Sequence, residues 1–288
     1  MSWFKVCLTP PADLLEPLSN RFFELGAQGV EENGAQLIAY FPEAERAPIE
    51  NQVREYLNSL MEMRKEKSPL AFTLTTVKDE NWTEAYKKYF HAQKLTKLFF
   101  LKPLWEPNAP VPFGMIPIEM EPGQAFGTGL HQSTQLSLRL MEKVTRFFPD
   151  ASKENLLDIG TGTGILAMGA HFLKYRDIMA VDNDPLAVEA AQENCNHNHC
   201  RRVLVSADSV ADLKASYSVV VSNILLETHR ELAAEYARLC KKGGYLILAG
   251  LLVHQVPEAV KILKPYGFLF EEARYLQEWG SLLVRRQV

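Results

Sequence analysis

A glycine-rich turn between an apolar run and a helical pattern constrains the fold of this chain more than any other feature. It lies within residues 155–167, where glycines occupy positions 160, 162 and 164. Glycine lets a ligand come close to the main chain, so N–H groups and the start of a helix become available to a bound nucleoside. The next apolar run closes at Asp182, 22 residues past Gly160, where a carboxylate can accept both hydroxyls of a ribose.

The spacing of the glycines separates two cofactor classes. A nicotinamide enzyme requires G-x-G-x-x-G, but the third glycine position of that pattern falls on Ile165. The dinucleotide fingerprint therefore fails. Asp158 lies two residues before the first glycine. The alternative is a glycine-rich turn that joins strand to helix and binds nothing.

Composition describes a globular chain without secretion or membrane signals. The 288 residues are 47% apolar, which suits one large or two modest domains with an ample core. The first ten residues lack the long apolar segment of a signal peptide, and no run elsewhere approaches a membrane span. The four cysteines contain no C-x-x-C pair, which fits reduced thiols. We expect a cytoplasmic protein.

The charge balance bears on the kind of partner. The formal net charge is −4, which does not indicate a large nucleic-acid footprint, although an average can conceal a local basic surface. A basic protein partner suits this charge better. We therefore expect no requirement for direct contact with nucleic acid.

A cluster of cysteine, asparagine and histidine at residues 195–200 suggests metal binding at first sight. It closes a helical pattern immediately before the apolar run that starts at Val203, and its packed spacing matches no common zinc arrangement. We expect a solvated helix end there and no metal site.

The N-terminal third predicts a small α+β domain. Its alternating and helical patterns follow the order β-α-β-β-α-β of a ferredoxin-like fold, and Asn33-Gly34 is a strong hairpin signal. The domain carries no chemical motif, so residues 1–77 serve either as a substrate-recognition module or as structural padding. The predicted elements are strands at 3–8, 28–32, 35–41 and 70–77 and helices at 12–25 and 48–63.

The remainder predicts a linker helix and an α/β domain. Residues 78–96 carry aromatic side chains among charges, which favours an amphipathic linker helix. From residue 97 to residue 288 strands and helices alternate, which is typical of a doubly wound, mostly parallel sheet. The strands are expected at 98–103, 113–121, 155–160, 178–182, 202–207, 217–223 and 244–250, the helices at 132–147, 165–174, 185–197, 227–240 and 255–263, and a closing hairpin at 268–275 and 279–286.

Several segments resemble one enzyme family. Residues 121–134 read Glu-Pro-Gly-Gln-Ala-Phe-Gly-Thr-Gly-Leu-His-Gln-Ser-Thr, which resembles the D-P-G-x-A-F-G-T-G-x-H-x-T-T signature of the ribosomal protein L11 methyltransferases, the PrmA family. Residues 219–226 are similar to the V-V-A-N-I-L of that family and residues 243–252 to its G-G-x-L-x-L-S-G-I-L. The turn at 158–164 resembles motif I of the class I methyltransferases that use S-adenosylmethionine.

The chain departs from the family pattern at a few positions. It has Gly-Thr-Gly-Thr-Gly at 160–164 where the family often has G-C-G-S-G, Leu130 where it usually has Thr, and Gln-Ser at 132–133 for Pro-Thr. The glycines, His131 and Thr134 stay in place. The resemblance extends to the small N-terminal domain, Trp82 and Trp279.

The resemblance implies a fold, an activity and a site. The fold is α/β, a Rossmann-like class I methyltransferase domain joined to the ferredoxin-like domain. The implied activity transfers methyl groups from S-adenosylmethionine to lysine side-chain or N-terminal amines of ribosomal protein L11. The implied cofactor contacts are Thr134, Gly160, Asp182 and Asn223, with Phe126, Gly127, Asp158, Gly162 and Asp208 as further candidates.

Alternatives remain open for individual residues and for the function. Asn223 is the expected catalytic residue beside the reacting sulfonium, whereas His131 serves either as a base or as a loop anchor. Thr134 is alternatively a helix cap, Asn223 a strand-end turn residue, and Asp208 a solvated carboxylate. A lysine methyltransferase of another protein, an RNA or small-molecule methyltransferase, and a noncatalytic binding module are the alternative functions.

Overall fold

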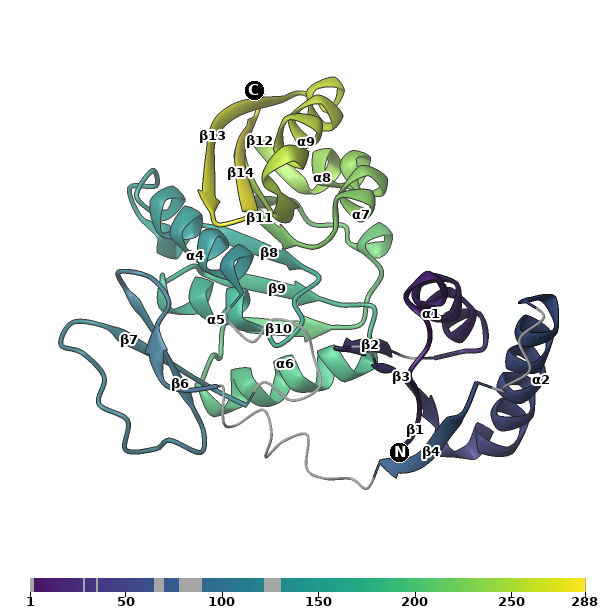
Figure 1. The fold of residues 1–288 in the computed structure, drawn as a ribbon. Helices are drawn as coiled ribbons and strands as arrows, with labels where there is room; N and C mark the ends of the chain where they lie inside the picture. The colour runs from purple at the N-terminus through teal and green to yellow at the C-terminus, as the bar shows by residue number, and fades with distance from the viewer. Residues whose placement is uncertain are drawn as a thin grey trace. The chain divides into compact units, whose positions relative to one another are not determined.

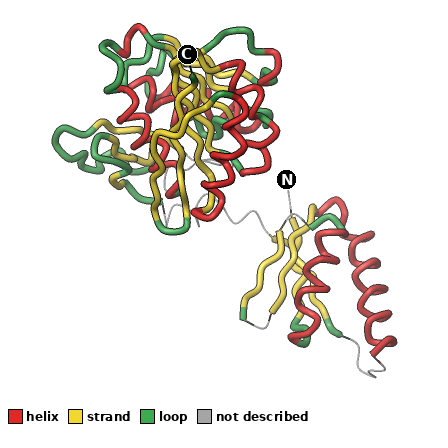
Figure 2. The backbone as a smooth tube through the Cα atoms, turned by 90° about the horizontal axis from the view of Figure 1, so that it is seen from above, coloured by secondary structure: helices red, strands yellow, loops and turns green. Residues whose placement is uncertain are grey.

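The chain divides into two compact units, Met1–Tyr89 and Phe90–Val288. The computed structural model describes residues 3–27, 29–34, 36–64, 70–77, 90–121 and 131–287. Each unit has its own secondary structure and its own hydrophobic core (Figures 1 and 2). Within the described ranges, no helix combines the length and the apolarity that crossing a membrane requires.

The first unit has the predicted β-α-β-β-α-β order. Its four strands form one antiparallel sheet in the order β2-β3-β1-β4, the ferredoxin-like arrangement. The two helices lie against one face of that sheet (Figure 2). The elements are β1 (Trp3–Leu8), α1 (Leu15–Glu24), β2 (Gly29–Asn33), β3 (Gln36–Pro42), α2 (Arg46–Arg64) and β4 (Phe72–Val77).

Alternation along the strands explains this core. Phe4, Val6 and Leu8 of β1 point to the same face and are buried, as the two-residue period requires. They pack in one cluster with Leu18 and Phe22, which lie one turn apart on α1. The predicted elements of this unit are therefore confirmed to within a few residues at their ends.

The second unit contains a seven-stranded sheet in the order β10-β9-β8-β11-β12-β14-β13. The first five of these strands are parallel, and β14 runs antiparallel between β12 and β13. Helices cover both faces (Figure 2), so the predicted doubly wound sheet with a closing hairpin is confirmed. The strands are β8 (Asn155–Ile159), β9 (Asp177–Val181), β10 (Val203–Ser206), β11 (Tyr217–Asn223), β12 (Cys240–Leu252), β13 (Phe268–Leu276) and β14 (Trp279–Arg286).

The helices of this unit match the periodic segments with one exception. The single helix expected at 227–240 is divided, since α7 ends at Glu231 and α8 begins at Ala233. Residue 240 already belongs to β12. The helices are α4 (Gln132–Thr145), α5 (Ile165–Phe172), α6 (Pro185–His197), α7 (Leu226–Glu231), α8 (Ala233–Leu239) and α9 (Val256–Leu263).

A small separate sheet corrects two predictions. The strands expected at 98–103 and 113–121 exist, as β6 (Phe99–Pro103) and β7 (Ile116–Met120), but they form a three-stranded sheet with β5 (Gln93–Lys94) and do not join the large one. The linker helix expected over 78–96 is wrong at its end, because residues 90–96 are not helical and contain β5. Residues 78–89 lie outside the described residues.

Two asparagines of helix α6 and the turn after it hold strand β7. The Asn198 Oδ1 accepts the backbone N–H of Glu119 at 2.9 Å, and the Asn194 Oδ1 accepts that of Glu121 at 3.1 Å. Asn194 Nδ2 also donates to the backbone oxygens of Glu121 and Thr163. Residues four apart on a helix are separated by about the same distance as residues two apart on a strand. The two side-chain amides therefore bind the backbone of β7 in the way that a neighbouring strand would.

This attachment corrects the solvated helix end expected at 195–200. Cys195 and Cys200 are buried, and His197 Nε2 lies 3.0 Å from Glu119 Oε2. Only His199 and Asn196 of the cluster stay exposed without a role in holding β7. Within the described ranges, no group of three His, Cys, Asp or Glu side chains is arranged to hold a metal ion.

Asn194→Ala is expected to lower the free energy of unfolding by about 2 kcal/mol. It removes one hydrogen bond from the Glu121 N–H and two to the backbone oxygens of Glu121 and Thr163, and each such bond contributes about 0.5–1.5 kcal/mol. Urea unfolding followed by circular dichroism measures the change. Asn196→Ala, on the exposed face of the same helix, is the control, and an equal loss in both variants would contradict the bridging role of Asn194.

Candidate functional site

The glycine turn connects β8 to α5 at the carboxyl edge of the sheet. Gly160, Gly162 and Gly164 have φ of 72°, 55° and 82°, a left-handed region in which a side chain is strained. The backbone N–H groups of Gly160 and Thr161 both donate to the Val181 carbonyl, at 2.9 and 3.1 Å, which ties the turn to β9. Ligands of open α/β sheets bind at this edge.

Asp158 is fully buried beneath the turn. Its Oδ2 accepts the Thr161 hydroxyl at 2.7 Å and the Ala167 backbone N–H at 3.1 Å. Its Oδ1 is buried and has no hydrogen-bond partner among the described residues. Burial raises the pKa of Asp158 to about 7, against the effect of those two hydrogen bonds, and the charge of Asp182 adds to the rise. A cation beside Oδ1 would supply the missing partner.

Asp182 follows β9 and braces the same turn. Its Oδ2 accepts the Gly162 backbone N–H at 2.9 Å, and its Oδ1 accepts the Asp184 N–H at 3.1 Å. Each oxygen keeps a further lone pair for a ligand hydroxyl. With Asp158 it makes this edge of the sheet electronegative, which favours a positively charged ligand.

Asn223 ends β11, two strands away from β9 on the other side of β8. Its Nδ2 donates to the Thr134 Oγ1 at 3.2 Å, whereas its Oδ1 is buried without a partner among the described residues. Thr134 is fully buried in the first turn of α4. The residue that precedes α4 is His131, so the alternative that Thr134 caps the helix is wrong. Thr134 instead orients the amide and leaves its carbonyl oxygen available.

His131 is held at the start of α4 by two contacts. Its Nδ1 lies 2.7 Å from the Ser133 Oγ, and its ring packs edge-on against Trp279 with centroids 4.3 Å apart. Burial lowers the pKa of His131, against the effect of the nearby Glu278 charge. These contacts favour a loop anchor, and a proton-transfer role stays a prediction.

Ile224 packs against both Gly160 and Gly250, two glycines that the sequence patterns did not connect. A Cβ placed on Gly160 would lie 2.7 Å from the Ile224 Cγ2, and one on Gly250 would lie 2.3 Å from the Ile224 backbone oxygen. Both glycines therefore permit β8 and β12 to close around the residue after Asn223. The positive φ of Gly250 could not be read from the sequence, because this glycine lies inside an apolar run.

The structure brings together most of the expected site residues. Asp158, Gly160, Gly162 and Asp182 surround the glycine turn, and Asn223 with Thr134 lies at the same edge of the sheet. Asp208 is exposed after β10, and its backbone N–H donates to the Ser206 Oγ at 3.1 Å. Phe126 and Gly127 lie outside the described residues. Asn194 and Ile224 were missed because nothing in their local sequence shows which backbone they meet.

Comparison with known proteins decides the family. The profile of a family described as ribosomal protein L11 methyltransferase (PrmA) matches residues 2–287. The chain belongs to the PrmA family. The chain is 29% identical over 316 aligned positions to a ribosomal protein L11 methyltransferase of Bacillus subtilis, covering 99% of this chain and 100% of that protein.

Two further PrmA relatives agree with this result. A ribosomal protein L11 methyltransferase of Geobacter metallireducens is 32% identical and is covered to 97%, with 98% of this chain aligned. A solved structure of a ribosomal protein L11 methylase from Lactobacillus delbrueckii is 28% identical to this chain, with a TM-score of 0.62. The alignment covers 69% of this chain and 100% of the chain in that structure. The resemblance found in the motifs is therefore confirmed.

We expect the stability of this PrmA-family chain to fall between pH 5 and pH 8 because of Asp158. The folded state binds this proton more tightly than the unfolded chain, so stability from this group is lost as pH rises through about 7. Asp158→Asn removes the ionisation and flattens the profile by on the order of 2 kcal/mol. Asp208→Asn, which removes an exposed carboxylate, is the control. Parallel profiles for wild type and Asp158→Asn in urea titrations would show that the buried group does not ionise.

Proposed function

We propose that this chain transfers methyl groups from S-adenosylmethionine to lysine side-chain or N-terminal amines of ribosomal protein L11. The observation that carries this proposal is the buried Oδ1 of Asn223, which has no hydrogen-bond partner among the described residues and whose amide is oriented by Thr134. It lies at the sheet edge that carries the glycine turn. The names of the relatives supply the substrate, and the site supplies the chemistry.

The residues of the edge fit S-adenosylmethionine. The Asp158 Oδ1 is a buried acceptor without a partner in the part of the chain that the structure describes, which suits the ammonium of the methionine part. Asp182 suits the ribose hydroxyls, and the turn at Gly160 has no side chain to obstruct the nucleoside. When bound, the cofactor supplies a methyl group on a sulfonium, a strong electrophile whose positive charge is favoured by the two carboxylates.

The protein's remaining task is to present an uncharged amine. A free lysine has a pKa of about 10.4, so the neutral form near pH 7 costs roughly 4 to 5 kcal/mol. Burial at the site lowers that cost because it disfavours the charged form. The Asn223 Oδ1 accepts an N–H of the amine and aims its lone pair, while no nucleophilic side chain is required.

The direct test is methylation of purified ribosomal protein L11. Mass spectrometry after incubation with enzyme and labelled cofactor is expected to show added methyl groups on amines. Asn223→Ala is expected to remove most of this activity because the amine loses its acceptor, whereas Asn196→Ala, on the exposed face of α6, is the control. Label in RNA or in a different protein, with none in L11, would favour one of the alternative functions.

Asp182→Ala is expected to weaken cofactor binding by about 2 kcal/mol or more, since the ribose hydroxyls lose a charged acceptor. Isothermal titration calorimetry measures the affinity. Because Asp182 also accepts the Gly162 N–H, Asp182→Asn is measured in parallel as the variant that keeps one oxygen. Asp184→Ala removes the neighbouring carboxylate, which caps α6 through the Leu186 N–H, and is expected to keep the affinity. Unchanged affinity in a folded Asp182→Ala protein would remove this residue from the site.

The first unit is proposed to recognise the substrate. The residues of its core lie between Phe4 and Met61, and those of the larger core between Leu157 and Val284, so the two clusters share no side chain. All site residues belong to the second unit. The first unit therefore contributes binding energy that orients the amine.

Removal of residues 1–89 is expected to leave cofactor affinity nearly unchanged and to abolish methylation of L11. The cofactor residues keep their core, whereas the amine is no longer presented. Calorimetry and a methylation assay measure the two effects on one preparation, and circular dichroism confirms its fold. A truncated protein that methylates L11 at the rate of the intact chain would contradict the assignment.

A further inference from the structure

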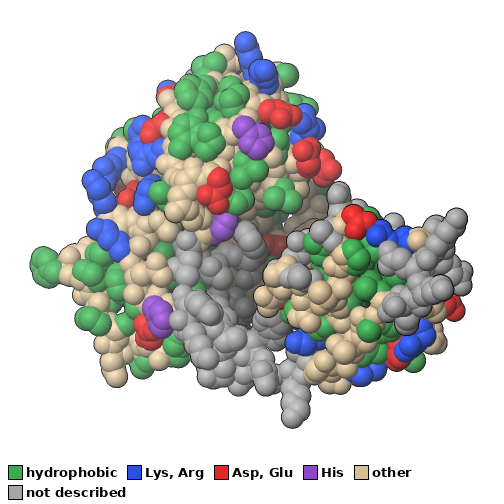
Figure 3. Space-filling model, in the orientation of Figure 1, with side chains coloured by type: hydrophobic (Ala, Val, Ile, Leu, Met, Phe, Trp, Pro, Cys, Tyr) green, Lys and Arg blue, Asp and Glu red, His purple; other side chains and the backbone are tan. Residues whose placement is uncertain are grey.

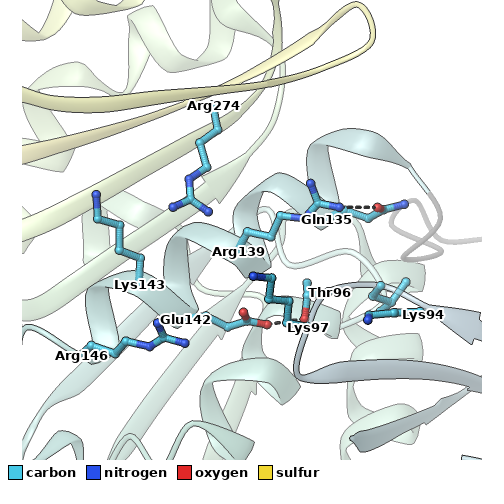
Figure 4. Close-up of a pocket in the computed structure, with 10 residues that line it drawn as sticks. Lys94, Thr96, Lys97, Gln135, Arg139, Glu142, Lys143, Arg146 and Arg274 are labelled. Carbon is cyan, nitrogen blue, oxygen red and sulfur yellow. Dashed lines mark hydrogen bonds between the residues drawn. The ribbon is translucent and has the colours of Figure 1, made fainter. Parts of the chain in front are cut away.

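A basic groove of about 800 Å³ lies on the outer side of helix α4. Its walls come from α4, from the β5–β6 turn and from strand β13 (Figure 4). Ten residues line it, of which six are cationic and one is acidic. They are Lys94, Leu95, Thr96, Lys97, Gln135, Arg139, Glu142, Lys143, Arg146 and Arg274.

The groove is separate from the candidate cofactor site. Gln135, Arg139 and Glu142 of α4 and Arg146, the residue directly after it, recur every three or four residues and line the groove. Thr134, by contrast, is fully buried on the side that meets Asn223. One helix therefore lines the groove and supports the site, but no residue that lines the groove belongs to the site.

The charges of the groove are only partly compensated. Glu142 accepts the Thr96 hydroxyl, and Glu272 beside the groove pairs with Lys143 and Arg274. Among the described residues, Lys94, Lys97 and Arg146 have no carboxylate partner. Arg139 reaches only the amide oxygen of Gln135, at 3.4 Å.

This concentration of positive charge contrasts with the whole chain, whose formal net charge is −4. In the space-filling view Lys and Arg side chains gather along the flank of the second unit that α4 and β13 form (Figure 3). Four cations without carboxylates repel one another, so an anionic occupant stabilises the groove. A basic polypeptide such as a lysine-bearing substrate segment is repelled, which excludes the groove as its route.

An aromatic ring next to the groove favours one class of anion. Phe147 follows Arg146 and is 45% exposed. The Lys143 ammonium lies 5.8 Å from the centre of its ring. Proteins that bind single-stranded nucleic acid combine a cationic groove that follows the backbone with aromatic rings on which bases stack. An acidic peptide uses the cations but has no need of the ring.

We propose that this groove binds the phosphate backbone of single-stranded RNA. The outer face of α4 from Gln135 to Arg146 spans roughly 16 Å at 1.5 Å per residue, enough for more than one phosphate. Arg139 and Arg146 contact phosphates from α4, and Lys94 and Lys97 do so from the opposite wall. This binding is independent of the cofactor and of methyl transfer.

The test measures binding of a fluorescently labelled single-stranded 20-mer RNA to the full chain by anisotropy, without cofactor. Each phosphate contact contributes about fivefold to affinity near 0.1 M salt, so Arg139→Gln combined with Arg146→Gln is expected to weaken binding about 25-fold. The slope of log affinity against log salt is expected to become shallower by about 1.4. Lys94→Gln with Lys97→Gln tests the opposite wall with the same expected loss.

A charge-matched variant controls for general electrostatics. Lys214→Gln with Lys261→Gln removes two exposed cations from other elements and is expected to keep wild-type affinity. Thermal unfolding confirms that all variants are folded. The proposal is overturned if wild type does not bind the RNA, if both groove variants bind like wild type, or if the control loses as much. Tighter binding of poly-glutamate than of RNA would overturn it in favour of an acidic protein partner.

Discussion

The hydrogen bonds of one buried carboxylate hold the centre of the second unit together. Asp158 is the next-to-last residue of the buried strand β8, and it accepts hydrogen bonds from both the Thr161 hydroxyl and the Ala167 N–H at the start of α5. The three glycines of the turn have no side chains with which to fix its shape, so that shape depends on these bonds and on the Val181 carbonyl. Burial raises the pKa of this carboxyl group to about 7, so its charged form is costly, and this is the point at which we propose that a cationic part of the cofactor binds.

The close approach of backbone segments at two glycines fixes the other side of the site, where Asn223 lies. Gly160 and Gly250 let β8 and β12 close around Ile224, which places Asn223 at the sheet edge. Thr134 of α4 then holds the amide. Helix α4 is therefore fixed by the site on one side, and its outer face presents the cations of the groove in a rigid array. A shift of this helix would disturb both features, although they share no residue.

Periodic segments were predictable, and isolated contacts were not. The strands from β8 to β12 and helices α5 and α6 follow apolar runs and helical spacing, so their positions agree with the sequence to within a few residues, apart from the early start of β12. Residues 90–96 read as the end of a helix because Phe90 continues the pattern of aromatic residues among charges that precedes it in the sequence. Asn198 read as part of a solvated helix end and Asn194 was missed, because an amide that binds a distant backbone resembles one that binds water.

The sequence by itself determined the strand-turn-helix unit, the acidic residues around it and the family, because these depend on local spacing. Only the tertiary structure decided that Thr134 holds the Asn223 amide and that its buried oxygen has no partner among the described residues, since the two residues are 89 positions apart. It alone gathered Lys94, Arg139 and Arg274 into one groove inside a chain of negative net charge. Charge totals and periodicity are properties of neighbours along the chain, whereas a binding surface is made by segments that packing brings together.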